Sequence, residues 1–294
     1  MRILITGGSG FLGWNLCRYF KNTHHILGTF GRHRPDDSGG EFVHLDILDA
    51  GAVNRICESF TPDFIIHTAA MTSPAECMDN MERSWEINVS GTENITRAAI
   101  RAKSRLIFIS TDRVFGGEKG EYKETDPTGP RGQYGRTKLA GEDIIRKIAT
   151  DYIILRLPLM YGFPSPFHSS FLGFMLDGFI NGETIELFQD QFRTPLCAED
   201  AGRGIQNLID HPELTGIYHL GGSERINRSD FGYRMAEIFG FDPSVIRPTL
   251  MAEKNGIPPT PTDASLNSDK FFQATGFRGR NVTEGLLALN LKCS

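Results

Sequence analysis

Residues 1–13 read Met1-Arg2-Ile3-Leu4-Ile5-Thr6-Gly7-Gly8-Ser9-Gly10-Phe11-Leu12-Gly13, an apolar run followed by a glycine loop. The run predicts a buried strand, and the residues after the loop predict a helix. Glycines at three-residue spacing allow a tight turn and a close backbone approach to a pyrophosphate at the helix N-terminus. Alone, such a triad could be a flexible Gly/Ser turn, but its place between strand and helix indicates a dinucleotide site. The residues expected to line it are Gly7, Gly10, Phe11, Leu12 and Gly13.

The alternation of strand and helix continues through the first half of the chain, which predicts an α/β fold with a doubly wound parallel Rossmann sheet. Right-handed crossovers should cover both faces of this sheet. The expected strands are Arg2 to Thr6, His25 to Phe30, Phe42 to Leu45, Asp63 to His67, Arg105 to Ser110 and Tyr152 to Leu157. The expected helices are Phe11 to Phe20, Ala50 to Phe60, Met81 to Ala102 and Tyr134 to Thr150.

After residue 160 the pattern loosens and predicts a smaller, interleaved C-terminal lobe that binds substrate. A helix is expected at Glu199 to Asp210, a strand at Gly216 to Leu220, and a loop between helices at Ile257 to Thr262. We therefore expect a dinucleotide-binding domain over residues 1–162, to which the chain returns over 192–220. Residues 163–191 and 221–294 would form the substrate-binding lobe.

Composition narrows the class of ligand. The 294 residues are 39% hydrophobic and carry a formal net charge of −5, which argues against a nucleic-acid partner and favours small molecules. No stretch approaches the roughly 18 apolar residues of a membrane span, and the start of the chain lacks a signal-peptide pattern. The five cysteines have no metal-ligand spacing and suit free thiols, so we expect a cytoplasmic protein. No ligand cluster appears in the sequence, so no metal-site residues are predicted.

Basic residues follow the second expected strand, where an NAD-selective site would place Asp or Glu. Arg32 and Arg34 stand there instead, and a guanidinium can hold a 2′-phosphate, although both could be solvated loop charges. The expected cofactor is NADP(H), with NAD(H) left open. Asp46 is placed to accept from the adenine amino group, with Ile47 beside it, but the aspartate could equally cap the following turn.

A second group of polar residues predicts catalysis. Thr111 ends the fifth expected strand, and Tyr134 and Lys138 share one face of the next helix. An ammonium beside a phenol stabilises the phenolate and moves its pKa toward the working range. Lys138 also has donors for the nicotinamide ribose, and Thr111 could polarise a carbonyl. Tyr-x-x-x-Lys alone is often an exposed helix face, but with the glycine loop it indicates an active site.

At this point the chain resembles the extended short-chain dehydrogenase/reductases, and within them the dTDP-4-dehydrorhamnose reductase group. The resemblance covers nearly the whole chain. Its motifs are the glycine loop with His67-Thr68-Ala69-Ala70, Ile87-Asn88-Val89-Ser90-Gly91-Thr92, Ile109-Ser110-Thr111-Asp112-Arg113-Val114-Phe115, Tyr134-Gly135-Arg136-Thr137-Lys138-Leu139-Ala140-Gly141-Glu142, Leu155-Arg156-Leu157-Pro158 with Tyr161-Gly162, and Phe192-Arg193-Thr194-Pro195.

The resemblance implies that Thr111, Tyr134 and Lys138 form the catalytic triad, with Tyr134 and Lys138 also touching the cofactor. It further implies that Ala69, Ala70, Leu157 and Asn88 line the cofactor, while simple packing could explain the alanines and a buried polar bond could explain Asn88. In many relatives two such helices pair in a dimer. A homodimer could therefore form here through the expected helices Met81 to Ala102 and Tyr134 to Thr150.

Two departures from the group's pattern bear on the substrate. The loop Ala70-Met71-Thr72-Ser73-Pro74-Ala75-Glu76 lacks the group's Val-Asp-Lys-Ala-Glu run, and Arg113 replaces a common aromatic residue. Related sugar-nucleotide dehydratases carry an acidic residue where Arg113 stands, so the resemblance disfavours dehydration.

The expected function is NADPH-dependent reduction of the C4 ketone of a nucleotide-linked 4-keto-6-deoxy sugar. The chain also resembles the regulatory β subunit of methionine adenosyltransferase, which keeps this fold and binds NADP while serving a partner protein. A nucleotide-sugar epimerase is a third alternative. Arg193, Arg203 and Arg225 could bind the diphosphate of a nucleotide sugar, or could be ordinary surface charges.

Overall fold

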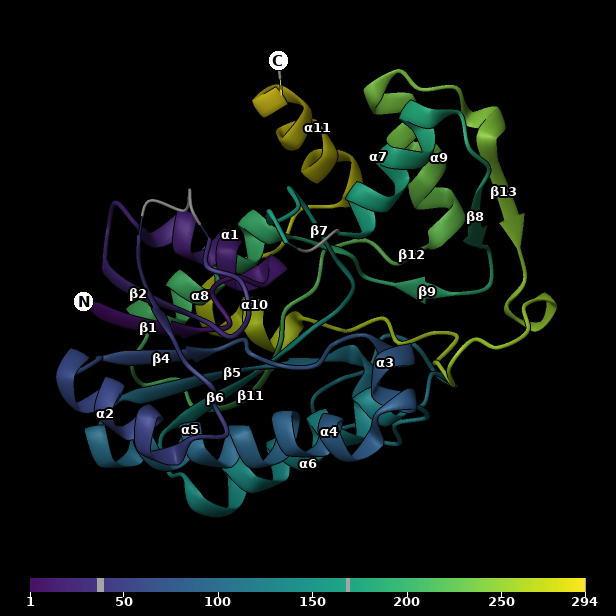
Figure 1. Ribbon diagram of the computed structural model, residues 1–294. Helices are drawn as coiled ribbons and strands as arrows, with labels where there is room; N and C mark the ends of the chain where they lie inside the picture. The colour runs from purple at the N-terminus through teal and green to yellow at the C-terminus, as the bar shows by residue number, and fades with distance from the viewer. Residues whose placement is uncertain (36–39, 168–169, 294) are drawn as a thin grey trace.

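A seven-stranded sheet forms the centre of the protein (Figure 1). The computed structural model describes residues 1–35, 40–167 and 170–293. The strand order of the sheet is β11-β6-β5-β4-β1-β2-β3, and every neighbouring pair is parallel. The strand bounds are β1 Arg2–Thr6, β2 His25–Phe30, β3 Glu41–His44, β4 Phe64–His67, β5 Arg105–Thr111, β6 Tyr152–Leu157 and β11 Gly216–His219.

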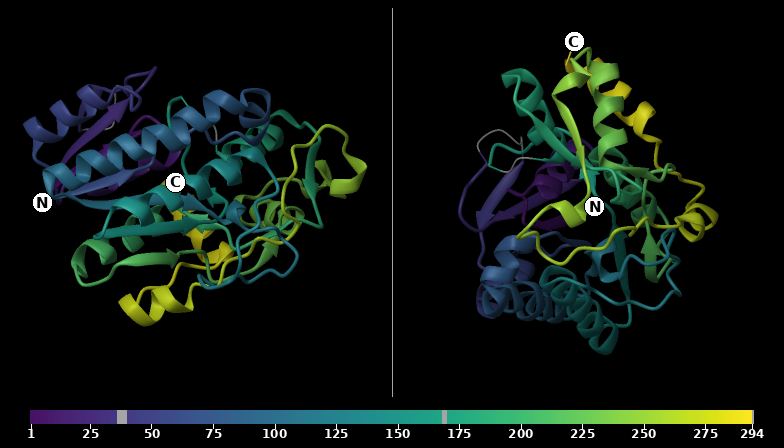
Figure 2. Two further views of the ribbon diagram at one scale, coloured as in Figure 1. Left: turned by 90° about the horizontal axis from the view of Figure 1, so that it is seen from below. Right: turned by 90° about the vertical axis from the view of Figure 1, so that its right-hand side faces the viewer.

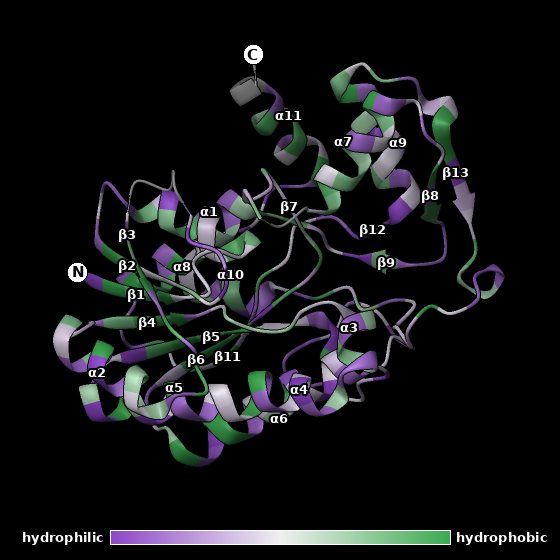
Figure 3. Cartoon of the chain, viewed as in Figure 1, coloured by the Kyte–Doolittle hydropathy of each residue, from purple (hydrophilic) through white to green (hydrophobic). Residues whose placement is uncertain are grey.

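Helices cover both faces of the sheet, as the two views of Figure 2 show. The strands between them are buried on both sides, and the central ones are coloured as hydrophobic in Figure 3. One face carries α1 Phe11–Phe20, α8 Ala198–Asp210 and α10 Asp269–Thr275, and the other carries α2 Ala50–Phe60, α5 Gly91–Ala102 and α6 Gln133–Ile148.

Alternate residues of each strand enter different cores. Ile107 packs with α1 and α8, whereas Phe108, the next residue, packs with α5 and α6. Phe271 of α10 also joins the core under α1 and α8, so this late helix packs on the sheet. The doubly wound arrangement predicted from the sequence is therefore confirmed.

A third core lies beyond the carboxyl ends of the strands, in the part at the upper right of Figure 1. Five elements supply most of its side chains: α7 Phe171–Asn181, β8 Ile185–Phe188, α9 Arg228–Phe239, β13 Ile246–Thr249 and α11 Val282–Cys293. We call these elements the C-terminal lobe. Short strands connect it to the sheet: β7 Met160–Tyr161 pairs with β10 Leu196–Cys197, and β9 Phe192–Arg193 pairs with β12 Ile226–Asn227.

The helix expected over Met81 to Ala102 is confirmed in its bounds, but a π-helical turn interrupts its α-helical geometry. The structure has α4 Met81–Trp85, then a π-helical turn over Glu86–Ser90, then α5, after a short α3 at Pro74–Asp79. Such a turn admits one extra residue and often lies at a functional site.

Two smaller expectations shift slightly. The third strand begins one residue earlier than expected, at Glu41, and the loop Ile257 to Thr262 follows a 3-10 turn, Met251–Glu253, instead of an α-helix. Across the described ranges, no helix combines the length and the hydropathy that crossing a bilayer requires.

Candidate active site

The glycine loop lies between β1 and α1, where the strand order reverses and a doubly wound fold binds its ligand. Gly7 has φ +71, a left-handed conformation, and a Cβ there would lie 2.7 Å from the backbone of Ala69. A Cβ on Gly13 would lie 2.2 Å from the Gly7 carbonyl oxygen. Side chains at these positions would collide with backbone, so the turn keeps its N–H groups open to a phosphate.

We expect Gly13→Ala to disrupt this loop. The methyl group must displace the Gly7 carbonyl, which should cost about 1–3 kcal/mol of unfolding free energy and weaken dinucleotide binding. Gly10→Ala is the matched control, because its Cβ would lie 3.3 Å from the same oxygen. Denaturant unfolding and NADPH titration of both variants measure this. Equal effects of the two substitutions would contradict it.

The other residues expected to line the cofactor lie at the carboxyl edge of the sheet. Ala69 and Ala70 follow β4 directly and are half-buried, with Ala69 against Gly7. Leu157 ends β6 and is paired in register with Thr111. Phe11 and Leu12 begin α1. The ends of β4 and β6 and the start of α1 therefore lie around the glycine loop. Contact of these residues with a cofactor stays a prediction.

The residues expected to select NADP lie further out. Arg32 and Arg34 are exposed, just after β2, and neither forms an ion pair within the described ranges. Asp46 is exposed and accepts a 2.9 Å hydrogen bond from the Leu48 N–H, so it caps the turn, as the alternative reading proposed. Ile47 is buried and packs against Gly91 of α5.

Asn88 is occupied by internal hydrogen bonds. It is 1% exposed, accepts from the Met71 N–H at 2.8 Å, and donates to the Met71 carbonyl and to Thr137 Oγ1, both at 2.9 Å. The buried polar bond, the alternative to direct cofactor contact, is therefore what the structure shows. Asn88 holds the loop after β4 against the helix that carries Tyr134.

Thr111 and Tyr134 meet at the carboxyl end of β5. The Thr111 side chain lies close enough to the half-buried Tyr134 to act on the pKa of its phenol, in the lowering direction. Thr111 Oγ1 donates to Asp112 Oδ1 at 3.1 Å and accepts from the Arg113 N–H at 3.3 Å. Gly135 lets Tyr134 come this close, because a Cβ there would lie 2.2 Å from the Arg113 carbonyl oxygen. The structure thus brings the predicted threonine and tyrosine together and places Arg113 beside them.

The predicted effect of Lys138 on the phenol differs from what is found. Burial raises the pKa of Tyr134 to about 12, and the cation that most lowers it is Arg113. Lys138 is 3% exposed, with Nζ 3.9 Å from the centroid of the Phe108 ring. Burial lowers the pKa of Lys138 to about 7, against a smaller raising effect of Glu142. The i,i+4 spacing is correct, but the ammonium packs into the protein instead of stabilising the phenolate.

Replacing Lys138 with methionine should stabilise the protein while impairing function. A lysine whose pKa falls from 10.5 to about 7 on folding lowers stability below pH 7, and this loss disappears as pH rises toward 10.5. Lys138→Met should therefore raise the unfolding free energy at pH 6 by about 1–4 kcal/mol and flatten its rise at higher pH. Denaturant unfolding from pH 6 to 9 measures this, and an unchanged pH slope would contradict it.

A buried ionic network supports the strand that ends in Thr111. Glu142 accepts from Ser110 Oγ at 2.5 Å and from Arg156 Nε and Nη2 at 2.9 and 2.6 Å. Arg156 Nη1 lies 3.3 Å from His219 Nε2. Sequence reasoning missed this network, although a charge at Arg156 inside an apolar strand was a signal for it. It fixes the ends of β5, β6 and β11 relative to α6.

The three arginines considered for a diphosphate have different surroundings. Arg193 is buried beside Asp112, Arg203 pairs with Asp200 on α8, and Arg225 pairs with Asp263 at 2.6 Å. Arg193 alone of these contacts the strand-end region that holds Thr111.

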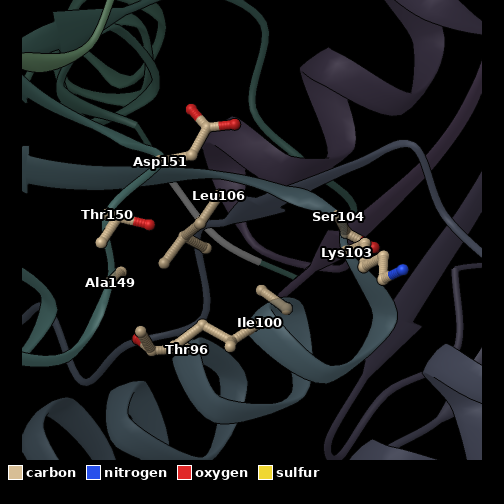
Figure 4. A pocket seen from close by; sticks show the side chains of 9 residues that line it. Thr96, Ile100, Lys103, Ser104, Leu106, Ala149, Thr150 and Asp151 are labelled. Carbon is tan, nitrogen blue, oxygen red and sulfur yellow. The ribbon is translucent and has the colours of Figure 1, made fainter.

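The pocket shown in Figure 4 lies away from the edge of the sheet that holds the glycine loop and Thr111. It is at the start of β5 and β6, the edge of the sheet opposite the glycine loop. Its lining is Thr96, Ala99, Ile100, Lys103, Ser104, Leu106, Ala149, Thr150 and Asp151. Among the residues described, no cluster of His, Cys, Asp and Glu could hold a metal ion.

Comparison with known proteins yields relatives over most of the chain. Methionine adenosyltransferase 2 subunit beta of Xenopus tropicalis is 32% identical, over 92% of this chain and 81% of its own. A probable low-salt glycan biosynthesis reductase of Haloferax volcanii is 30% identical, over 86% of this chain and 85% of its own. The crystal structure of a hypothetical dTDP-4-dehydrorhamnose reductase from Sulfolobus tokodaii superposes with TM-score 0.84 and 30% identity, covering 97% of this chain and 99% of that one.

The family described as the RmlD substrate binding domain matches residues 1–291, which is nearly the whole chain. The resemblance inferred from the motifs is confirmed, and the chain belongs to the RmlD substrate-binding family of extended short-chain dehydrogenase/reductases.

Proposed function

We propose that this protein reduces the C4 ketone of a nucleotide-linked 4-keto-6-deoxy sugar with NADPH. The observation that carries the proposal is that Thr111 and Tyr134 lie close together at the sheet edge that also holds the glycine loop. Relatives named as reductases support it.

The described residues fit a dinucleotide. The glycine loop leaves a cradle that Cβ atoms at Gly7 and Gly13 would fill, next to the N-terminus of α1. Arg32 and Arg34 are exposed and free of ion pairs within the described residues, which suits a 2′-phosphate. NADPH would supply the hydride, while Lys138 would donate to its ribose.

The protonated form of Tyr134 is the form that can act as the acid in a reduction. With its pKa at about 12, Tyr134 keeps its proton at neutral pH and can give it to the alkoxide that forms when a ketone is reduced. Thr111 would orient the carbonyl toward this phenol. The C-terminal lobe would hold the sugar nucleotide. We propose that residues 1–162 and 192–220 bind the dinucleotide and that residues 163–191 and 221–294 bind the substrate, except for α10, which packs on the sheet.

The test is NADPH oxidation, followed by absorbance, with dTDP-4-keto-6-deoxy-L-mannose. NADH and other nucleotide keto sugars serve as comparisons, and Arg32→Ala with Arg34→Ala should reduce the preference for NADPH over NADH. Tight NADPH binding without oxidation for any keto sugar would overturn the proposal.

A second candidate function is a regulatory subunit that binds NADP. The 32% identity to a methionine adenosyltransferase β subunit favours it, and an intact Thr111, Tyr134 and Lys138 is compatible with it. Mixing the protein with a methionine adenosyltransferase catalytic subunit and measuring the mass of any complex tests it. A stable complex together with no keto-sugar turnover would favour this function, whereas an epimerase would convert its sugar without net NADPH consumption.

A further inference from the structure

The segment that follows β7 lies against the start of α1, next to the glycine loop. Gly162 has φ +152, and a Cβ there would lie 3.6 Å from Phe11 Cζ. Asn15 Nδ2 donates to the Phe163 carbonyl at 3.2 Å and to the Phe11 carbonyl at 2.8 Å. The segment therefore passes the helix N-terminus at which this fold binds the pyrophosphate of its cofactor.

The same segment reaches the loop after β2 through an aromatic contact. The rings of His33 and Phe167 are stacked, with centroids 5.2 Å apart and 20° between their planes. His33 stands between Arg32 and Arg34, the residues expected to hold the 2′-phosphate of NADP. We call the pair His33 and Phe167 the clasp. Residues 163–167 thus extend from the pyrophosphate end to the adenosine end of the expected cofactor position.

The segment is stiff and is attached to the C-terminal lobe. Pro164 and Pro166 fix the φ angle at two of its positions. The Phe163 side chain packs against the third core, and so does Phe171 at the start of α7. The lobe therefore sets the position of Phe167, whereas the central sheet sets the position of His33. The clasp is a contact between these two parts of the molecule.

The clasp is weak enough to open and close. Phe167 is 38% exposed and His33 is exposed. Among the residues that the structure describes, neither ring stacks on any other ring. A single aromatic pair contributes little beyond the area it buries, and exposed side chains and loops move rapidly. A ligand can therefore enter while the rings are apart and be covered when they meet again.

We propose that His33 and Phe167 close over the adenosine half of the bound dinucleotide and delay its release. The clasp also joins the loop after β2 to the lobe, so a bound cofactor holds the lobe in a fixed position relative to the sheet. The inference rests on the dinucleotide binding that the reductase and the regulatory subunit share, and it depends on neither of these functions alone.

The test is the rate at which NADPH leaves the protein. Protein loaded with NADPH is mixed with an excess of NADP⁺ in a stopped-flow instrument, and the loss of bound nicotinamide fluorescence is followed. Phe167→Ala and His33→Ala should each speed release about two- to tenfold, which corresponds to the contribution of one aromatic pair. Phe167→Trp should keep release slow, because it retains a ring that can stack.

Phe174→Ala is the matched control. Phe174 is a 51% exposed phenylalanine on α7, and among the described residues its ring stacks on no other ring. Its variant should release NADPH at the rate of the unmodified protein. Release from both Phe167→Ala and His33→Ala at that same rate would overturn the proposal.

A double variant separates a clasp from two independent contacts. Because either substitution removes the stack, the protein with both should release NADPH no faster than the faster single variant. The factors should be the same for NADH, which shares the adenosine half but lacks the 2′-phosphate. Effects that multiply, or an effect of His33→Ala on NADPH alone, would contradict the clasp, and the second would indicate direct contact of His33 with the phosphate.

Folding and the proposed reduction are separated from the clasp by two further measurements. Both side chains are exposed, so the alanine variants should keep the thermal unfolding midpoint. Clasp-dependent release of NADPH with no keto sugar reduced would disprove the proposed reduction alone. Keto-sugar reduction by a protein whose release rate ignores both substitutions would disprove this inference alone, and absence of NADPH binding would overturn both.

Discussion

Tyr134→Phe is expected to lower kcat for keto-sugar reduction by about 10²- to 10⁴-fold, the usual contribution of a positioned general acid. Phenylalanine keeps the ring but removes the proton that the alkoxide needs. NADPH binding should change little, because the glycine loop and Arg32 lie on other elements. Steady-state kinetics and NADPH titration separate the two effects.

Tyr152→Phe is the matched control for this substitution. Tyr152 begins β6, at the opposite edge of the sheet from Thr111, so its variant should keep the full kcat. A Tyr134→Phe protein with unchanged turnover would show that the phenol is not the acid. Loss of NADPH binding in that variant would instead indicate a structural role.

Glu142→Ala is expected to lower the free energy of unfolding by about 3–5 kcal/mol, because it leaves Arg156 buried without its carboxylate. Ser110 loses its acceptor at the same time. The double variant Glu142→Leu with Arg156→Met should recover most of this loss, because it removes both charges and keeps apolar volume. Denaturant unfolding of the three proteins measures it.

An exposed pair provides the comparison. Arg97 and Glu93 are 2.7 Å apart on α5 with side chains 55% and 39% exposed, so Glu93→Gln should cost less than about 1 kcal/mol. If Glu142→Ala were as mild as Glu93→Gln, the Arg156 pair would not be a major support of the strand ends.

Local patterns were enough to predict the framework. The apolar run before Gly7 and the helix after it depend on neighbouring residues, and the structure has both within the expected bounds. Continuous apolar runs such as Ile107 to Ile109 predicted strands buried on both faces, which β5 confirms. Spacing also predicted that Tyr134 and Lys138 lie one turn apart on the helix that α6 confirms.

Contacts between distant segments could not be predicted in this way. The π-helical turn holds Asn88 where it binds Met71 and Thr137, and no local periodicity reports such a contact. The sequence placed Lys138 one helical turn from Tyr134 but did not show that burial against Phe108 dominates its pKa.

The most direct test of the proposed reduction follows the hydride itself. The protein is incubated with NADPH that carries deuterium at both C4 positions of the nicotinamide, together with dTDP-4-keto-6-deoxy-L-mannose, and the product is analysed by NMR and mass spectrometry. The reductase function predicts one deuterium at C4 of the sugar, with a matching amount of NADP⁺, and a rate of incorporation about 10²- to 10⁴-fold lower in Tyr134→Phe. Bound NADPH that transfers no deuterium to any nucleotide keto sugar would contradict it and leave the regulatory function as the better explanation.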